Sequence, residues 1–281
     1  MNKEQHKITE INKGWEKMLA QERQRKILEL VSKHKSASIS RLAKELEVSP
    51  MTIRRDLAKL TEEGKLERVY GGAVSKIPVG YEPPYLTREG EDVEEKRLIA
   101  QVAASLIQEG DALLLATGTT VVEVARAIDP DLNLTVVTSS LPVAMELVAK
   151  PKVKLMLAGG LLRREGLSTT GHIAEYCLGE INADKLITSA AGLSLEEGIT
   201  EYSNEDAVVK RAMLDRAREV IVVSHHSKLE RVAFASVAPL EKIDLLITDS
   251  GIEPELVELY QEREIKVVIA GRGDEDERAT K

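Results

Sequence analysis

The sequence of 281 residues predicts an α/β protein in two parts, a small helical unit followed by a larger domain built on a mostly parallel sheet. Three observations lead to this prediction. Helix-period patterns fill residues 20–75, a stretch rich in proline, glycine and charge covers 76–95, and seven short apolar runs alternate with helical patterns over 96–270. This length and arrangement suit about two domains.

The charge of the chain is divided along nearly the same boundary. Residues 20–77 hold 13 Lys and Arg against 8 Asp and Glu, whereas residues 78–281 hold 22 against 36. A basic unit on an acidic body indicates that only the first part meets a polyanion. A small helical domain can also be mildly basic by chance, so charge alone does not decide.

Three helices are expected in the N-terminal unit. The first begins near Gln21, the second follows a break and takes Ser40 as its cap, and the third begins at Ser49 and Pro50. Serine is a favoured N-cap, and proline fits the first helical turn because its missing N–H is not needed there. The apolar positions that share the inner faces are Ile27, Leu28, Leu30, Val31, Leu42, Ala43, Leu46, Ile53, Leu57 and Leu60.

The outer face of the third helix is the expected DNA-reading surface. A short turn before a helix with outward polar side chains is typical of a helix-turn-helix, and residues 64–74 resemble a β-hairpin wing. Arginine suits guanine edges and phosphates. The alternative is a helical bundle with solvated charges. The candidate DNA contacts are Ser40, Ser49, Thr52, Arg54, Arg55, Lys59, Lys65 and Arg68.

The larger domain is expected to hold a parallel sheet, because its apolar runs are hydrophobic on both faces and alternate with helices. The expected strands cover residues 112–116, 134–138, 153–158, 185–190, 220–224, 244–248 and 265–270, and the expected helices cover 93–108, 120–128, 141–149, 172–179, 203–217 and 254–262. The predicted divisions are an N-terminal extension (1–19), the helix-turn-helix unit (20–75), a linker (76–95), the α/β domain (96–270) and a disordered tail (271–281).

Ligands of such sheets bind beyond the carboxyl ends of the strands. The stretch Thr117, Gly118, Thr119 and Thr120 stands there, between a strand and a helix, and offers backbone N–H groups and hydroxyls to an anion. A second strand end, at Ser139, has the same chemistry. Each motif alone is weak evidence for an anion site, because an ordinary capped turn between a strand and a helix has the same sequence pattern.

Long motifs resemble the DeoR family of bacterial transcriptional regulators. They include "SPMTIRRDL" and "GGA" in the first part, and "TGTT", "VVTSS", "LAGGLLRR" and "SHHSKLERVAFASVAPL" in the second. The resemblance covers roughly residues 18 to 255. It implies a winged helix, and a sensor domain that resembles ribose-5-phosphate isomerase and binds phosphorylated sugars. Three positions depart from the family pattern, namely Tyr70, Ser139 and His225.

The resemblance also implies site residues. Thr117 to Thr120 would hold the phosphate, with Lys210 and Lys228 as cationic partners. The expected function is a transcriptional regulator, most simply a repressor of a carbohydrate-metabolism operon that a phosphorylated sugar releases from operator DNA. The alternative is an isomerase-like enzyme with a helical appendage, but Ala190 and Ala191 stand where a catalytic Asp is expected. A third alternative is a sugar-phosphate-binding protein with no DNA role.

The sequence also predicts whether a metal, a cofactor, a second subunit or a membrane takes part. His225 and His226 are adjacent, and neighbouring strand residues point to opposite faces, so no metal site is expected there. No cofactor is expected either. A homodimer or homotetramer is expected, because one winged helix reads one half-site. The absence of a membrane-length apolar run or a signal peptide predicts a cytoplasmic protein without a membrane partner.

Overall fold

The computed structural model describes residues 20–33, 36–69, 71–75 and 81–271. The chain divides into two compact units, Met1–Pro78 and Val79–Lys281, which are described separately below. The expected extension over 1–19, residue Tyr70, the start of the expected linker and all of the expected tail except Gly271 lie outside the described residues.

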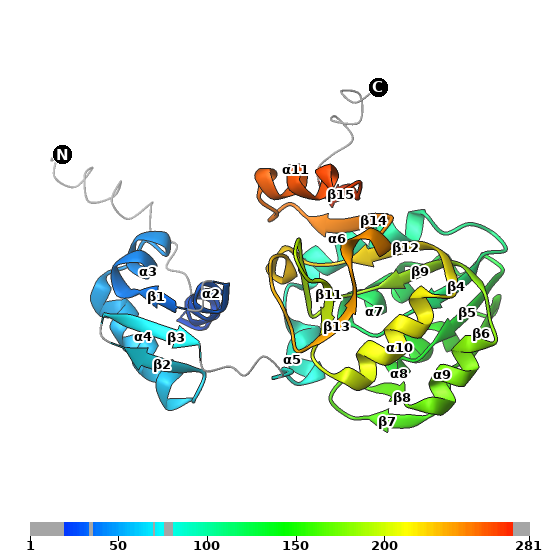
Figure 1. The fold of residues 1–281 in the computed structure, drawn as a ribbon, viewed down its shortest axis with the longest axis horizontal. Coiled ribbons are helices and arrows are strands. Elements are labelled where there is room, and N and C mark those ends of the chain that lie inside the picture. The colour runs from blue at the N-terminus through cyan, green and yellow to red at the C-terminus, as the bar shows by residue number, and fades with distance from the viewer. Residues whose placement is uncertain (1–19, 34–35, 70, 76–80, 272–281) are drawn as a thin grey trace, which may run out of the picture. The chain divides into compact units, whose positions relative to one another are not determined.

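The first unit is a winged helix (Figure 1). The three strands form an antiparallel sheet in the order β1-β3-β2, in which β2 and β3 make the expected hairpin. The apolar faces of the helices pack against this sheet, and Ile53 and Leu57 are fully buried between them. The elements are α2 (Ala20–Lys33), β1 (Ser36–Ser38), α3 (Ile39–Glu45), α4 (Pro50–Glu62), β2 (Leu66–Val69) and β3 (Gly72–Ser75).

One expected cap in this unit is wrong. Ser38, not Ser40, is the N-cap of α3, and its Oγ accepts a hydrogen bond from the backbone N–H of Arg41 at 3.2 Å. β1 ends at Ser38 and α3 begins directly after it at Ile39, two residues earlier than a cap at Ser40 would place the start of the helix. Ser49 does cap α4, and its Oγ accepts from the N–H of Thr52 at 3.2 Å.

The expected linker over 76–95 is folded from Tyr85 onward. Helix α5 (Tyr85–Gly90) begins directly after Pro84, and α6 (Val93–Ser105) follows it. Tyr85 is buried, which fixes α5 to the second unit. The prolines and charges of this segment therefore mark the start of a helix as well as the end of a linker.

The second unit is built on a seven-stranded sheet in the order β15-β14-β12-β9-β4-β5-β6. Every pairing in it is parallel, and the seven strands are the seven predicted ones. Their bounds are β4 (Ala112–Leu115), β5 (Leu134–Thr138), β6 (Val153–Leu157), β9 (Ala183–Thr188), β12 (Ala217–Val223), β14 (Leu245–Asp249) and β15 (Lys266–Ala270).

Helices cover both faces of this sheet (Figure 1). Alternate strand residues belong to two separate cores: Leu113 and Leu115 pack with α6, α7 and α8, whereas Leu114 packs with α9, α10 and α11. This alternation explains why the strands are apolar on both faces. The remaining helices are α7 (Thr119–Ala127), α8 (Leu141–Val148), α9 (His172–Gly179), α10 (Asn204–Leu214) and α11 (Pro254–Glu262).

Short strands that the sequence did not predict lie outside the main sheet. β7 and β8 form one antiparallel pair, and β10, β11 and β13 form a three-stranded sheet. They have three or four residues each, too few to show a hydrophobic period. Their bounds are β7 (Leu161–Arg163), β8 (Ser168–Thr170), β10 (Gly192–Ser194), β11 (Gly198–Glu201) and β13 (Ala235–Ala238), and two short 3₁₀ turns, η2 (His226–Lys228) and η3 (Leu240–Lys242), complete the unit.

Candidate DNA-contacting surface and effector pocket

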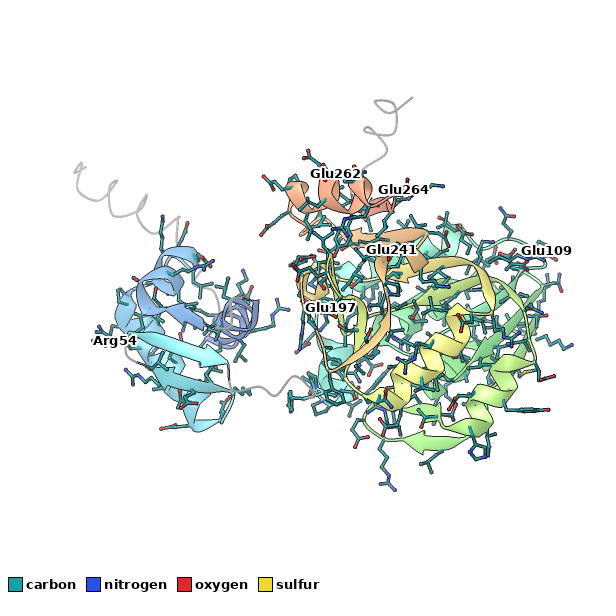
Figure 2. All side chains as sticks on the ribbon, viewed as in Figure 1. Arg54, Glu109, Glu197, Glu241, Glu262 and Glu264 are labelled. Atoms are coloured by element: carbon teal, nitrogen blue, oxygen red, sulfur yellow. The ribbon has the colours of Figure 1, made fainter. Side chains whose placement is uncertain are left out.

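The outer face of α4 carries the predicted DNA contacts. Arg54, Arg55 and Lys59 are exposed, and Thr52 is half-buried beside the capping Ser49 (Figure 2 labels Arg54). In the wing, Lys65 Nζ lies 2.8 Å from a carboxylate oxygen of Glu63, and this hydrogen bond lowers the pKa of Glu63. Arg68 is exposed on β2, and Ser40 is exposed on α3.

A buried ion pair on the inner face of α4 fixes the orientation of this helix. Arg23 Nε of α2 lies 2.6 Å from Asp56 Oδ2, and Gln24 Nε2 donates to the other oxygen at 3.0 Å. Asp56 is 2% exposed and follows Arg54 and Arg55 directly. Loss of one partner of a buried pair typically costs about 3–5 kcal/mol. The pair therefore fixes the rotation of α4 that turns its arginines outward.

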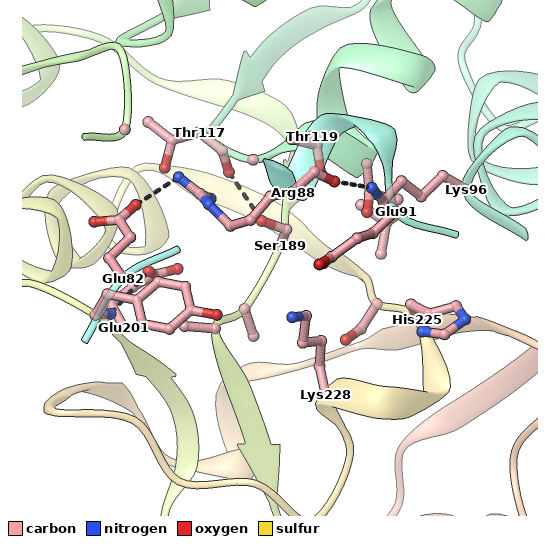
Figure 3. A pocket seen from close by; sticks show the side chains of 18 of the residues that line it. Glu82, Arg88, Glu91, Lys96, Thr117, Thr119, Ser189, Glu201, His225 and Lys228 are labelled. Atoms are coloured by element: carbon pink, nitrogen blue, oxygen red, sulfur yellow. Dashed lines mark hydrogen bonds and ion pairs between the residues drawn. The ribbon is translucent and has the colours of Figure 1, made fainter. Parts of the chain in front are cut away.

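The second unit holds a polar pocket at the carboxyl ends of its strands (Figure 3). The predicted Thr117, Gly118, Thr119 and Thr120 line it where β4 ends and α7 begins. The first N–H groups of a helix have no intrahelical acceptor, so this turn presents donors to an anion.

Gly118 is required in this turn. Its φ is +132°, and a Cβ there would lie 2.0 Å from Ser189 Oγ. Ser189 Oγ in turn donates to the Thr117 carbonyl at 2.9 Å, and Lys210 Nζ donates to the Ser189 carbonyl at 2.6 Å. A chain of hydrogen bonds thus runs from Lys210 through Ser189 to the turn that begins at Thr117.

Lys210 is buried beneath the pocket and does not line it. It is 2% exposed, and its ammonium lies 2.5 Å from Glu201 Oε1. Its charge is already balanced, so the structure gives it a positioning role behind Ser189. Ser139 is also outside the pocket, because Ser139 is 1% exposed and Thr169 of β8 donates its N–H to the Ser139 carbonyl at 2.8 Å.

Three cations line the pocket, and two of them were not predicted. Lys228 was predicted, and its ammonium makes no ion pair with any described residue. Arg88 comes from the segment that was expected to be a linker, and Lys96 comes from the expected helix over 93–108. Lys96 Nζ donates to the Arg88 carbonyl. Burial lowers the pKa of Lys96 and the charge of Lys228 adds to this, while Asp92 and other nearby carboxylates act against it. The signal that could have located Arg88 is the helical pattern that begins after Pro84.

Carboxylates bind two of the guanidinium groups at this site. Glu82 lies 2.5 Å from Arg88 Nη2 and 2.7 Å from Arg163 Nη2 (Figure 3 shows Glu82 beside Arg88). Arg163 Nε also donates to Asp206 Oδ2 at 2.9 Å. Burial raises the pKa of Glu82, while both arginines act against that rise. The segment before α5 is therefore attached to the pocket by ion pairs.

The two adjacent histidines both reach one carboxylate, so the geometric reason given against a shared site is wrong. His226 Nδ1 lies 2.6 Å from Asp249 Oδ2, and His225 Nε2 lies 3.8 Å from Asp249 Oδ1. The chain leaves the strand at Ser224 and turns, so strand alternation no longer applies. The Asp249 carboxylate also accepts hydrogen bonds from the backbone N–H groups of His226 at 2.7 Å and Gly251 at 3.0 Å. These bonds give Asp249 a structural role, because they hold the turn in place.

Two family patterns match the chain, one for each unit. The DeoR-like helix-turn-helix domain matches residues 23–78, and the DeoR C terminal sensor domain matches residues 91–250. Together with the fold, they define a protein that joins a DNA-binding unit to a sensor domain. Within the described residues, every helix is too short or too polar to cross a membrane.

Full-length relatives agree with this class. The transcriptional regulator GlpR of Haloferax volcanii is 38% identical over 89% of this chain and 98% of its own, and the transcriptional repressor AccR of Agrobacterium fabrum is 36% identical over 89% and 97%. The chain therefore belongs to the DeoR family of transcriptional regulators. Among solved structures, ribose 5-phosphate isomerase A of Methanocaldococcus jannaschii matches with 17% identity and a TM-score of 0.36, over 48% of this chain and 53% of that chain.

Proposed function

We propose that this regulator is a repressor of a carbohydrate-metabolism operon, and that a phosphorylated sugar releases it from operator DNA. The observation that carries the proposal is the anion-binding turn Thr117–Thr120, which faces Lys228, Arg88 and Lys96 in one pocket. Helix N-terminal N–H groups with nearby cations suit a phosphate. The relative AccR is named a repressor, which supports that direction of control.

The size of the pocket suggests how the ligand acts. The cavity has a volume of about 50 Å³, whereas ligand pockets usually measure roughly 300–1,000 Å³. A bound sugar phosphate must therefore widen it. The segment with Glu82 and Arg88 is suited to move, because it rests on ion pairs that an incoming phosphate competes for. It also lies a few residues from Val79, where the second unit begins, so its displacement reaches the connection to the DNA-binding unit.

The repressor proposal includes the absence of enzymatic activity. Isomerisation requires a carboxylate free to take a proton from carbon. Ala190 and Ala191, which line the pocket, take the position where a catalytic Asp was expected from the sequence. Five carboxylates of the described residues line the pocket, and three of them, Glu82, Glu201 and Asp206, are bound to a cation. Of the other two, Asp92 lies 3.5 Å from His225 Nδ1, and Glu91 stands outside the phosphate-facing turn Thr117–Thr120. These contacts favour ligand binding without turnover.

The test is an operator-release titration. The full chain is bound to DNA from upstream of its own gene at fixed salt, and a panel of sugar phosphates is added while DNA binding is followed by fluorescence anisotropy. We expect at least one sugar phosphate to weaken DNA binding by about 5- to 150-fold, the usual range of allosteric coupling. The same panel is checked for isomerised product by NMR.

Matched variants then test the pocket. Lys228→Met should bind operator as the parent does but need a higher ligand concentration for release. Lys242→Met, at an exposed lysine of η3 outside the pocket, should behave as the parent. Equal release of both variants removes Lys228 from the site, and a panel without any effect refutes the sensor proposal.

A further inference from the structure

The β6 edge of the seven-stranded sheet is rich in exposed apolar side chains. β6 pairs with β5 on one side and with no described strand on the other. The surrounding side chains are between 41% and 77% exposed. We refer to them as the apolar edge: Met145, Val148, Met156, Leu157, Leu161, Leu162, Ile173 and Tyr176.

Side chains of this set lie on both faces of the sheet beside β6, and Leu161 and Leu162 belong to β7, which begins four residues after β6 ends. On α9, Ile173 and Tyr176 are three residues apart and share one side of the helix, and the neighbouring Cys177 Sγ lies 3.9 Å from Met156 Sδ of β6. Successive strand residues point to opposite faces, so Leu157 lies on the face of α8.

The exposed apolar side chains of α8, Met145 and Val148, point away from the neighbouring helix α7. Glu146 of α8 receives a hydrogen bond from Arg126 of α7 at 2.9 Å, which shows the side of α8 that meets its neighbour. Met145 and Val148 are about 100° and 160° from Glu146 in the same rotational sense, at about 100° per residue. They therefore extend the apolar edge beyond α7, toward the open side of β6.

The apolar edge is large enough for a stable interface. With about 200 Å² for each fully exposed large side chain, the measured exposures amount to roughly 900 Å². The largest apolar patch on a typical monomer is about 300–600 Å², and a standard interface takes about 800 Å² from each partner. This surface is therefore too extensive for an ordinary solvated face.

We propose that the apolar edge binds a second copy of this chain, with β6 pairing antiparallel to β6 of the partner across a two-fold axis. An edge strand with apolar residues on both faces is complementary to itself under that symmetry. The opposite edge does not suit this role, because α11, which packs against β15, exposes Glu255, Glu258 and Glu262 (Figure 2 labels Glu262). Paired half-sites in operator DNA also require two winged helices. The inference does not depend on the identity of the effector.

Light scattering of the full chain during size-exclusion chromatography tests this surface. The parent should show at least twice the 30.9 kDa of one copy. Tyr176→Glu and Met145→Glu should each halve the mass of the assembly, because a charge is buried in the interface. Leu259→Glu, at an exposed leucine of α11 near the other edge, should keep the parent mass.

Circular dichroism and thermal unfolding establish that the variants are folded. If the parent is a tetramer, dimers of the two β6-edge variants support the proposal. A parent that elutes as a monomer at tens of micromolar overturns it and leaves the apolar edge to a different protein. Unchanged mass in both β6-edge variants, or loss of assembly only in Leu259→Glu, also overturns it.

Discussion

Removing the charge of Lys210 should destabilise the sensor domain strongly, although this side chain cannot touch a ligand directly. Lys210 is 2% exposed, and Lys210→Met leaves Glu201 as a buried carboxylate without its cation and the Ser189 carbonyl without its donor. Breaking a buried pair from one side costs about 3–5 kcal/mol. In a unit of this size, about 1 kcal/mol shifts the Tm by roughly 2–4 °C, so the Tm should fall by about 6–20 °C.

A double-mutant cycle separates the pair from the rest of the site. Glu201→Gln alone should also destabilise, whereas Lys210→Met combined with Glu201→Gln should recover at least about 2 kcal/mol, since no unpaired charge stays buried. Thermal unfolding followed by circular dichroism gives the Tm, and hydrogen exchange over residues 183–214 assigns the transition to the second unit. Lys242→Met is the surface control. A single Lys210→Met variant within about 2 °C of the parent would falsify the reasoning.

Three further predictions concern DNA, ligand and pH. Arg55→Ala should weaken operator binding by about 1–3 kcal/mol in an anisotropy titration, while Arg218→Ala in the second unit should not; equal affinities would remove Arg55 from the interface. Gly118→Ala should keep DNA binding and lose release by ligand, because its Cβ would meet Ser189; normal release would contradict the close approach. Burial lowers the pKa of His225 from 6.5, although Asp92 and Asp249 act to raise it. The folded state then binds fewer protons than the unfolded state, so stability should fall as pH drops below about 6.5, and His225→Gln should flatten the Tm profile between pH 5 and 7.

The main elements of both units follow from patterns within short windows of sequence. Seven apolar runs predicted the seven strands, and the helical period predicted α4 with Arg54 and Arg55 outward. Burial on both faces of a parallel sheet makes such runs conspicuous. The short strands outside the main sheet, β7, β8, β10, β11 and β13, were missed, because their three or four residues form no continuous apolar run.

The pocket was predicted only in part, because its charges come from distant segments. The turn Thr117–Thr120 was predicted from its position between a strand and a helix. Arg88 was missed because the prolines before it indicated a linker. The phosphate role of Lys210 was taken from the family resemblance, and its partner Glu201 could not be foreseen because Glu201 lies on β11, which was not predicted. Ion pairs between elements depend on tertiary packing, so single-segment patterns do not reveal them.

The unequal edges of the seven-stranded sheet also bear on solubility. A parallel sheet with an open edge at each end can in principle add strands from other molecules without limit, as in a fibril. Here β15, at one end, is accompanied by the acidic helix α11, with Glu262 and Glu264 exposed beside it. The exposed carboxylates at this edge outnumber its exposed cations, Arg263 and Lys266, so two copies that approach through these edges would bring net negative charges together. Growth of the sheet in this direction is therefore opposed by electrostatic repulsion, which should weaken as salt rises and screens the carboxylates.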